Sequence, residues 1–379
     1  MVFAPPSPLG VATHQPYDFL LGSVSLLVKK GSSPGVVSVC LCPQVRSRLV
    51  SAGYLETLLA ARSAIEGPSP EAWYDRLERE ESELEEALEA ACRDEPGLGL
   101  RATPLLQRFW FARGRLERGR KWVERLLLAA GTNATPDRAQ GLFAAGALAF
   151  RQGDTDATRR YASEALRLAK EFGAPELQID AALALARVGL REGDVEAVRR
   201  FAGEAQELAL KIRDEARELG AIHHLAEGAR IAGDYRLART LYEESLARNR
   251  ARGNRLIEAV ELANLSMVEK KEGNLQQAEV NLNKAIQISR EINNSYILAA
   301  CLVALAAVAA SARRARQSAR LLGGADAIYS VTGLVIDPAD KPEYDRAEIA
   351  ARSELGKEAF AAAYAEGAKL TIDRLLEAR

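Results

Sequence analysis

Five glycine-containing turns divide the middle of this 379-residue chain into units of nearly equal length. Their glycines are Gly114, Gly153, Gly193, Gly233 and Gly273, so successive turns are separated by about 40 residues. A period of this length, held over five or six units, is typical of a solenoid built from pairs of helices. Because each unit of a solenoid packs only on its neighbours, the chain length sets no number of separate globular domains.

When the units are aligned on these glycines, similar residues recur at fixed positions. The position twelve residues after the glycine is occupied by Ala165, Ala205, Ser245 and Ala285. The position nine residues after it is occupied by Ala162, Ala202, Tyr242 and Leu282. The position eight residues before it is occupied by Leu106, Ala145, Leu185, Leu225 and Leu265. Small residues at one position let two helices approach closely, and larger ones fill the space beside them. Each unit is therefore predicted to be an αα-hairpin.

The turns carry signals that end one helix and begin the next. Glycine adopts the left-handed conformation that closes a helix, and a following Asp or Asn accepts hydrogen bonds at the next helix start. One further step of the same length reaches Arg313 instead of a glycine. A non-glycine residue in the left-handed region costs roughly 1–2 kcal/mol, so we expect the sixth turn to differ in shape.

The repeat and its flanks predict an all-α fold in four segments. Residues 1–48 contain two short apolar runs that could form two strands. Because an isolated hairpin is marginally stable, we expect this segment to be poorly ordered. The alternative is that the start of the reading frame is wrongly assigned. Residues 49–97 are leading helices, including one from Glu71 to about Cys92. Residues 98–330 form a right-handed α-solenoid of about six helix pairs, and residues 331–379 form a cap of two helices, about 343–355 and 357–376.

One apolar segment, Tyr296 to Ala312, has the composition of a membrane helix. Its length is at the lower limit for crossing a bilayer, and it lies where the repeat requires the first helix of the sixth unit. We therefore interpret it as a buried solenoid helix. The N-terminus shows no secretory signal, and we expect no association with a membrane.

The charge and cysteine content of the chain limit the classes of binding partner and the cellular compartment that we expect. The 51 Lys and Arg residues balance the 52 Asp and Glu residues, so no net positive charge favours direct binding to nucleic acid. The cysteines, Cys40, Cys42, Cys92 and Cys301, are too few and too scattered for a disulfide framework or a zinc site. We interpret them as reduced thiols of a cytoplasmic protein.

The sequence lacks motifs for catalysis or cofactor binding. It has no Gly-x-x-x-x-Gly-Lys-Ser/Thr loop, and Gly323-Gly324 lies in a helical context. Besides His14, the histidines are His223 and His224, and adjacent helical residues point in different directions, which predicts poor co-ligands. The acidic face of the helix from Glu71 suggests acid/base chemistry, but a solvated surface is the simpler interpretation. We predict no enzyme activity, no metal and no cofactor.

The Gly-Asp turn and the small and aromatic positions of the second helix resemble the tetratricopeptide repeat, whose usual unit has about 34 residues. The longer unit is similar to the variant found in MalT-like regulators. HEAT and armadillo repeats also have about 40 residues, but they lack this turn and are the second choice.

Several stretches resemble the C-terminal half of bacterial STAND NTPase regulators, including LuxR-like and AfsR-like activators. They are Trp73-x-x-Arg76-Leu77-Glu78-x-Glu80, Arg108-Phe109-Trp110-x-x-Arg113-Gly114, Gly119-Arg120-x-Trp122-x-Glu124-Arg125, Ala319-Arg320-Leu321-Leu322-Gly323, Leu355-Gly356-x-Glu358-Ala359-Phe360 and Ala365-Glu366-Gly367. The resemblance covers about residues 50–379 and implies a sensor arm that binds an inducer or partner and controls an NTPase. The family's Walker motifs and helix-turn-helix are missing here, so ATP hydrolysis and DNA binding are not implied.

In a tetratricopeptide superhelix the first helices line the concave face. Transferring the repeat register places there Arg108, Phe111, Phe143, Phe150, Arg187, Arg191, His223, Glu227, Arg230, Met267 and Lys270. We expect this groove to accept an extended or helical peptide, or an anionic small ligand, through apolar anchors and charge. The alternative is that these residues only solvate the inner face.

The predicted function is a non-catalytic protein-interaction module, the sensor part of a bacterial signalling or transcription regulator. Its partner would be a protein or peptide, such as a separately encoded NTPase regulator. Two alternatives stay open: a sensor whose superhelix closes on a small-molecule inducer, and a truncated regulator fragment without function.

Overall fold

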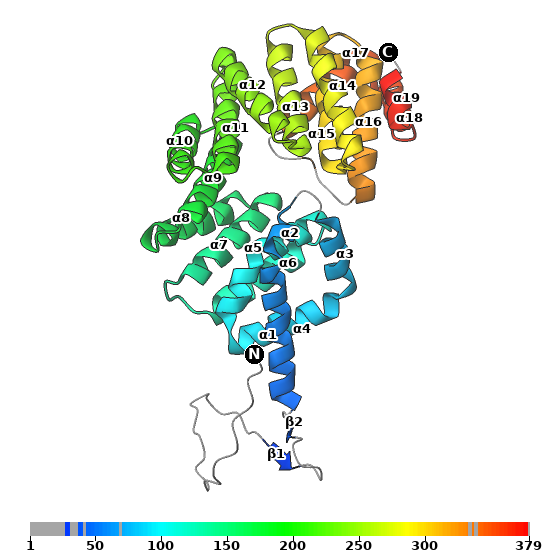
Figure 1. Cartoon of the computed structure of the whole chain (residues 1–379). Coiled ribbons are helices and arrows are strands. Elements are labelled where there is room, and N and C mark those ends of the chain that lie inside the picture. Colours follow the sequence, from blue (N-terminus) through cyan, green and yellow to red (C-terminus); the bar gives the residue numbers. More distant parts are fainter. Residues whose placement is uncertain are drawn as a thin grey trace, which may run out of the picture.

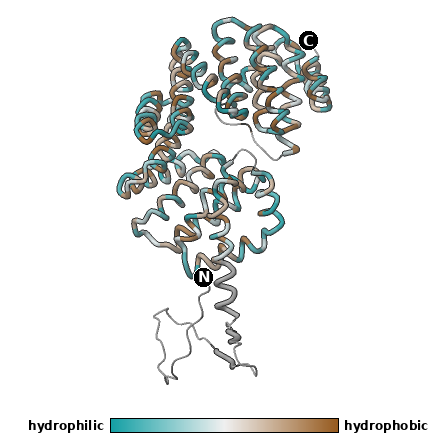
Figure 2. Tube along the Cα trace, viewed as in Figure 1, coloured by the Kyte–Doolittle hydropathy of each residue, from teal (hydrophilic) through white to brown (hydrophobic). Residues whose placement is uncertain are grey.

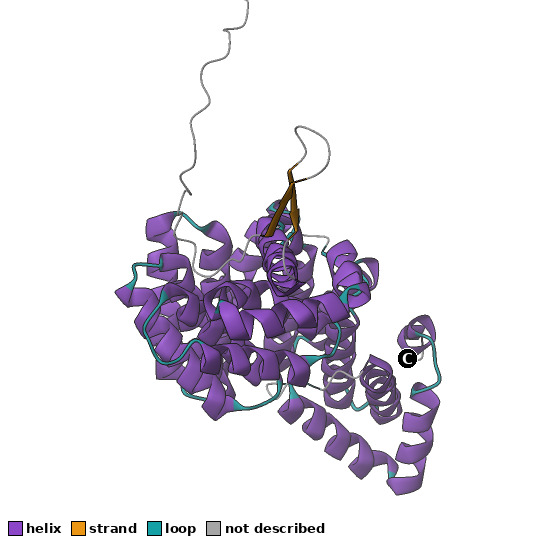
Figure 3. Cartoon of the chain, turned by 90° about the horizontal axis from the view of Figure 1, so that it is seen from below, coloured by secondary structure: helices purple, strands orange, loops and turns teal. Residues whose placement is uncertain are grey.

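The computed structural model describes residues 27–30, 37–40, 43–67, 70–332, 336 and 340–377. Apart from one hairpin these residues are almost entirely helical (Figures 1 and 3). Strand β1 (Leu27–Lys30) pairs antiparallel with β2 (Val37–Cys40), and Leu27 lies opposite Cys40. Most of the N-terminal segment that we expected to be poorly ordered lies outside the described residues.

Four leading helices precede the repeats: α1 (Pro43–Ala60), α2 (Arg62–Ile65), α3 (Glu71–Arg79) and α4 (Glu81–Asp94). The prediction of one helix from Glu71 to Cys92 is wrong, because the chain leaves helical geometry at Glu80, with φ −97° and ψ 27°. The break allows α4 to pack on both α1 and α5, where it buries Leu84 and Leu88. Sequence periodicity does not record such a change of axis, which depends on the neighbouring helices.

Six helix pairs follow and form the predicted right-handed solenoid. They are α5 (Pro96–Ala112) with α6 (Leu116–Ala129), α7 (Pro136–Arg151) with α8 (Thr155–Glu171), α9 (Pro175–Glu192) with α10 (Val195–Ile212), α11 (Glu215–Ile231) with α12 (Tyr235–Ala251), α13 (Arg255–Lys271) with α14 (Leu275–Glu291), and α15 (Ser295–Ser311) with α16 (Ala315–Thr332). Each first helix packs on its own second helix and on the next unit's first helix, as α9 packs on α11. In Figure 1 the array curves from α5 and α6 through α9–α12 to α15 and α16.

Glycine closes the first helix as the sequence predicts. The φ angles of Gly153, Gly193 and Gly233 are 80°, 73° and 83°. The Asp that follows each of them accepts a hydrogen bond from the third backbone N–H of the second helix, as Asp154 does from Ala157 at 2.9 Å. The fifth unit differs, since Asn274 makes no such cap and its Nδ2 donates to Oε2 of Glu269 at 2.9 Å.

The sixth turn keeps this conformation although it contains no glycine. Arg313 has φ 58°, and the amide of Arg314 donates to the carbonyl of Ala309 just as the amide of Asp234 donates to that of Ala229. The expectation of a reshaped turn is therefore wrong. The packing of α15 against α16 holds Arg313 in the left-handed region despite a cost of roughly 1–2 kcal/mol.

A second series of turns halves the repeat. The residues at the junctions between units, Gly131, Gly173, Arg213, Gly253 and Asn293, also have positive φ. From Gly173 onward each lies midway between the turn inside its own unit and the turn inside the next. Every helix from α8 to α16 consequently has 17 or 18 residues. An alignment on the Gly-Asp turns alone does not reveal this half-period, because two of the five junction residues are Arg213 and Asn293.

The recurring sequence positions form the core of the solenoid. Every residue nine or twelve positions after a turn glycine is buried, from Ala162 to Ala285, whereas Leu225 in the third series is only half-buried. Figure 2 shows hydrophobic positions alternating with hydrophilic ones along the helices. The apolar segment from Tyr296 is α15, and its burial confirms the interpretation as a solenoid helix. Within the described residues, no helix combines the length and hydropathy needed to span a bilayer.

Three helices form the C-terminal cap: α17 (Lys341–Leu355), α18 (Lys357–Gly367) and α19 (Ile372–Glu377). The prediction of two helices is wrong at the second, because the chain turns at residues 368–371. This turn brings α19 back onto α16, where Leu375 is buried against Gly324. Helix α18 packs across α16, and α17 packs against α15 and α16.

Candidate functional site

The eleven residues predicted for the concave face all lie on first helices. Helix α5 carries Arg108 and Phe111, α7 carries Phe143 and Phe150, α9 carries Arg187 and Arg191, α11 carries His223, Glu227 and Arg230, and α13 carries Met267 and Lys270. The ring of Phe111 lies edge-on to that of Tyr296 on α15, with centroids 6.3 Å apart. This ring contact links the first helices of units one and six.

Five side chains from three neighbouring first helices form what we call the aromatic–guanidinium strip: Phe111, Phe150, Arg151, Arg187 and Arg191. The guanidinium of Arg151 lies 4.2 Å from the ring centre of Phe111, and those of Arg187 and Arg191 lie 5.1 and 3.8 Å from that of Phe150. Nη1 of Arg191 also donates to the carbonyl oxygen of Phe150 at 3.1 Å. Arg151 was not among the predicted residues.

On α5 and α7, two predicted residues lie outside this strip. Phe143 is half-buried against the N-terminal hydrophobic core, and Arg108 is exposed on α5, near Tyr74. The aromatic character predicted for the N-terminal half of the groove therefore comes from Phe111 and Phe150 alone.

A group of largely buried polar side chains lies on α11 and α13, and we call it the histidine cluster: His223, His224, Glu227 and Glu261. Nδ1 of His223 lies 3.1 Å from both carboxylate oxygens of Glu261. Oε2 of Glu227 lies 3.3 Å from Nε2 of His223 and 2.9 Å from Nδ1 of His224. The two histidines, which the sequence predicts to be poor co-ligands, both contact Glu227, because Glu227 is four residues after one and three after the other, and both spacings share a helix face.

Burial and neighbouring charges shift the pKa values of this cluster in opposite directions. Burial disfavours the charged form of His223, but the carboxylates of Glu261 and Glu227 outweigh it and raise the pKa to about 9. Burial also disfavours a charge on Glu227, yet His223 and His224 lower the pKa to about 2. For His224 burial prevails, and the pKa is lowered. At neutral pH a charged and a neutral imidazole thus flank one carboxylate.

Glu261 was not among the predicted site residues, although its position in the repeat distinguishes it from the equivalent residues of the other units. The residues twelve positions before the turns are small or apolar except in the fifth unit: Ala102, Gly141, Ala181, Ala221, Glu261 and Cys301. Ser245 is likewise the polar exception among the alanines twelve positions after the turns. The two exceptions are partners, since Oγ of Ser245 donates to Oε1 of Glu261 at 2.5 Å. Both residues can be found from the sequence by looking for polar residues at repeat positions that are small or apolar in the other units.

The C-terminal part of the predicted groove is covered by the chain itself. Nζ of Lys270 forms an ion pair with Glu343 of α17, and these side chains are only 9% and 13% exposed. Met267 is buried as well. Burial disfavours the charged form of Arg230, but Tyr242 and Glu227, with a smaller contribution from Asp340, outweigh it and raise the pKa. Lys270 and Met267 are consequently not open to a partner in this conformation.

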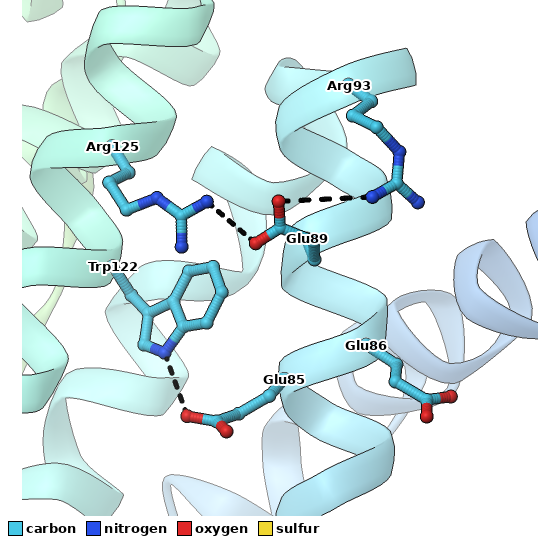
Figure 4. A pocket seen from close by; sticks show the side chains of 6 residues that line it. All are labelled: Glu85, Glu86, Glu89, Arg93, Trp122 and Arg125. Atoms are coloured by element: carbon cyan, nitrogen blue, oxygen red, sulfur yellow. Dashed lines mark hydrogen bonds and ion pairs between the residues drawn. The ribbon is translucent and has the colours of Figure 1, made fainter.

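The acidic face of α3 and α4 is not the purely solvated surface that we expected. Its carboxylates form ion pairs with α6 and with the turn that precedes it: Glu78 with Arg113 and Arg115, Glu81 with Arg115 and Arg118, Glu85 with Arg118, and Glu89 with Arg125. An open depression of about 500 Å³ lies beside them (Figure 4). Within it Nε1 of Trp122 donates to Glu85 at 3.3 Å, so these polar groups already bind one another. We assign this surface a structural role.

No protein-family profile matches this sequence, and neither does any curated protein. Solved structures do resemble the fold. A Rap protein complexed with Competence and Sporulation Factor has a TM-score of 0.53 at 13% identity, over 81% of this chain and 99% of that one. NprR in complex with its cognate peptide NprX has a TM-score of 0.53 at 16% identity, over 82% of this chain and 86% of that one.

A third structure is similar over a comparable length. The Rap conjugation gene regulator of the plasmid pLS20, in complex with the Phr* peptide, has a TM-score of 0.50 at 10% identity, over 83% of this chain and 98% of that one. At such identities the likeness shows the fold alone. This chain is a tetratricopeptide-like solenoid, and its structural neighbours are regulatory or interaction proteins.

Proposed function

We propose that this chain is a non-catalytic interaction module whose aromatic–guanidinium strip binds an acidic peptide or an acidic segment of a protein. In the wider setting that the STAND resemblance implies, it is the sensor part of a bacterial signalling or transcription regulator, and an NTPase regulator is a candidate partner. It acts in the cytoplasm and binds nucleic acid only through that partner.

The observation that carries this proposal is the strip itself. Three guanidinium groups from α7 and α9 lie over two phenylalanine rings within 5.1 Å or less. Stacking on a ring holds a guanidinium flat and restricts its rotamers, so less entropy is lost when it binds a carboxylate. Arginine in this arrangement suits planar, bidentate recognition of carboxylates.

The position of the strip supports binding at the N-terminal half of the groove. The C-terminal half is covered by α17 through the pair Lys270–Glu343. An extended segment placed over α5, α7 and α9 would meet Phe111, Phe150 and their arginines in successive units. Three structural neighbours were solved with a factor or peptide bound, as their descriptions state, and this is consistent with a peptide ligand here.

Selection from a random peptide library tests the proposal. Wild-type chain is expected to enrich peptides that combine Asp or Glu with apolar residues. The double variant Arg187→Gln/Arg191→Gln should bind the selected peptides at least about tenfold more weakly in fluorescence anisotropy, because charge-assisted hydrogen bonds are lost. Wild-type affinity should also fall as salt rises.

A matched control uses two arginines on second helices. Arg167 of α8 and Arg199 of α10 are exposed, and among the described residues each forms an ion pair with a carboxylate of its own helix, Glu171 or Glu196. The variant Arg167→Gln/Arg199→Gln removes the same charge and should keep wild-type affinity. Equal binding by both double variants and the wild type would show that the strip does not bind the peptide.

One observation favours the alternative of an inducer that closes the superhelix. The contact between Phe111 and Tyr296 joins units one and six across the curve, so a small molecule bound beside it would stabilise the closed form. A metabolite panel in a thermal-shift assay tests this. A compound that raises the Tm of the wild type but not of Phe111→Ala would support it, and a panel without hits would favour the peptide.

A further inference from the structure

We propose that His223, His224 and Glu227 bind a divalent transition-metal ion of the zinc type. The proposal extends beyond the peptide-binding function and does not rest on it. Two imidazole nitrogens and one carboxylate oxygen are a donor set that suits zinc, cobalt and nickel. All three ligands come from a single turn of α11, so the helix itself holds them together.

The distances suit a single ion. One nitrogen of each histidine and one oxygen of Glu227 all lie within 4.8 Å of one another. Ligands at about 2.0–2.2 Å from zinc in a tetrahedral site are separated by about 3.3 Å. Two of the three separations are already close to this, because Oε2 of Glu227 lies 3.3 Å from Nε2 of His223 and 2.9 Å from Nδ1 of His224. Small side-chain rotations would complete the site.

Glu261 supplies the outer contact that metal-binding histidines usually have. A ligating histidine commonly donates its second ring N–H to a carboxylate, which fixes its orientation and its tautomer. Nδ1 of His223 donates to Glu261, and Nε2 points toward Glu227. A bound ion would replace the proton on Nε2, which is released to solvent. Glu261 is fully buried and accepts a further hydrogen bond from Oγ of Ser245 at 2.5 Å.

This support continues into α12. Nδ2 of Asn249 lies 3.2 Å from Oγ of Ser245, and Nδ2 of Asn254 donates to Oδ1 of Asn249 at 3.1 Å. A chain of four side chains thus holds His223 from behind. The other units have small or apolar residues at the position of Glu261. The proposed site explains a buried carboxylate at this position, because Glu261 orients the metal ligand His223.

The surrounding charges select the class of ion. Arg187 acts electrostatically on His224, and Arg230 acts on His223. These cations oppose a hard ion such as Mg²⁺, which is held mainly by charge, more than an ion that bonds strongly to imidazole. Three protein ligands leave a fourth position open. The side chains of His223 and Glu227 are each 19% exposed, so water or a partner's carboxylate can reach that position.

The test uses the full chain freed of metal with EDTA. Titration with Co²⁺ should produce the visible absorption of a low-symmetry Co²⁺ site at one equivalent, and Zn²⁺ should displace it. Zn²⁺ should also raise the Tm, because a ligand that binds only the folded state stabilises it. Both His224→Gln and Glu227→Gln should abolish the one-equivalent absorption.

Glu261→Gln tests the positioning residue. It should weaken Co²⁺ binding by about 10–100-fold and shift the absorption bands, a readout that a purely structural role would not move. His14→Gln is the matched control, since it removes the remaining histidine and should bind like the wild type.

Circular dichroism of each metal-free variant verifies folding, and Glu227→Gln preserves the size of the side chain if His224→Gln does not fold. Unchanged one-equivalent Co²⁺ absorption in folded Glu227→Gln would overturn the proposal. So would a wild-type chain that binds neither Co²⁺ nor Zn²⁺ at one equivalent.

Discussion

Gly323 of α16 and Gly367 of α18 lie where the backbones of these two helices meet. A Cβ atom on Gly323 would overlap the carbonyl oxygen of Tyr364, and one on Gly367 would overlap that of Arg320. Beside the crossing, Arg320 pairs with Glu366 at 2.5 Å. Two of the stretches that carry the STAND resemblance therefore form one packing contact. Gly323 thus has a packing role.

Substitution at this crossing should detach the C-terminal helices. Gly367→Ala is expected to lower the free energy of unfolding by roughly 1–3 kcal/mol, as overpacking generally does, and to speed hydrogen exchange in α18. Gly203→Ala is the control, because Gly203 lies inside α10 and a Cβ there would have no neighbour within 4 Å. It should stabilise by up to about 1 kcal/mol. Urea denaturation compares the two, and a Gly367→Ala variant as stable as Gly203→Ala would contradict the crossing.

The strained turn at Arg313 can be relieved. Arg313 is exposed and has φ 58°, so Arg313→Gly removes a conformational cost of roughly 1–2 kcal/mol. The greater freedom of glycine in the unfolded chain offsets up to about 1 kcal/mol of this. We expect a small net rise in Tm. The opposite change, Gly193→Ala at φ 73°, should lower the Tm. Tm shifts of the same sign in both variants would contradict the turn geometry.

The pair Lys270–Glu343 predicts a pH dependence. Burial would raise the pKa of Glu343, but the hydrogen bond and charge of Lys270 outweigh it and lower the pKa. Such a carboxyl stabilises the fold above its unfolded pKa of about 4.3, and this stability is lost as pH falls through the folded pKa. Glu343→Gln should therefore destabilise the protein at neutral pH.

The difference in unfolding free energy between wild type and Glu343→Gln should shrink as the pH falls below about 4.3. Glu354→Gln serves as the control on the same helix, because Glu354 is exposed; its difference from wild type should stay small at every pH. A difference for Glu343→Gln that does not change with pH would argue against the pair.

The contact between Phe111 and Tyr296 predicts that the superhelix is held in a closed curve. Phe111→Ala should increase the radius of gyration measured by small-angle X-ray scattering, since an aromatic pair contributes about 0.5–1.5 kcal/mol beyond the area it buries. Phe172→Ala, at the exposed C-terminal end of α8, should leave the radius unchanged. Identical scattering from wild type and Phe111→Ala would show that the curvature is set within the units.

The repeat made most of the fold predictable. The Gly-Asp turns correctly placed the solenoid and its six helix pairs, because a helix end depends on a few neighbouring residues. The errors lie where distant packing decides the outcome. The helix breaks at Glu80, and α4 then packs on α1 and α5. Arg313 keeps a left-handed turn because α15 and α16 pack together.

The candidate site shows the same division. All eleven residues were correctly assigned to first helices, since the repeat register determines which helix carries them. The register does not determine contacts between units. It therefore missed Arg151 over Phe111, Glu261 behind His223, and Glu343 over Lys270, in each of which the two partners lie far apart in the chain.

By itself the sequence determined the period, the helix pairs and the helix that carries each candidate residue, because all of these follow from local backbone preferences and from a pattern that recurs in every unit. Only the tertiary structure decided which part of the inner face is open and which is covered by α17. It also decided that two adjacent histidines share one carboxylate. These outcomes depend on curvature and on side chains that meet only after the units have stacked.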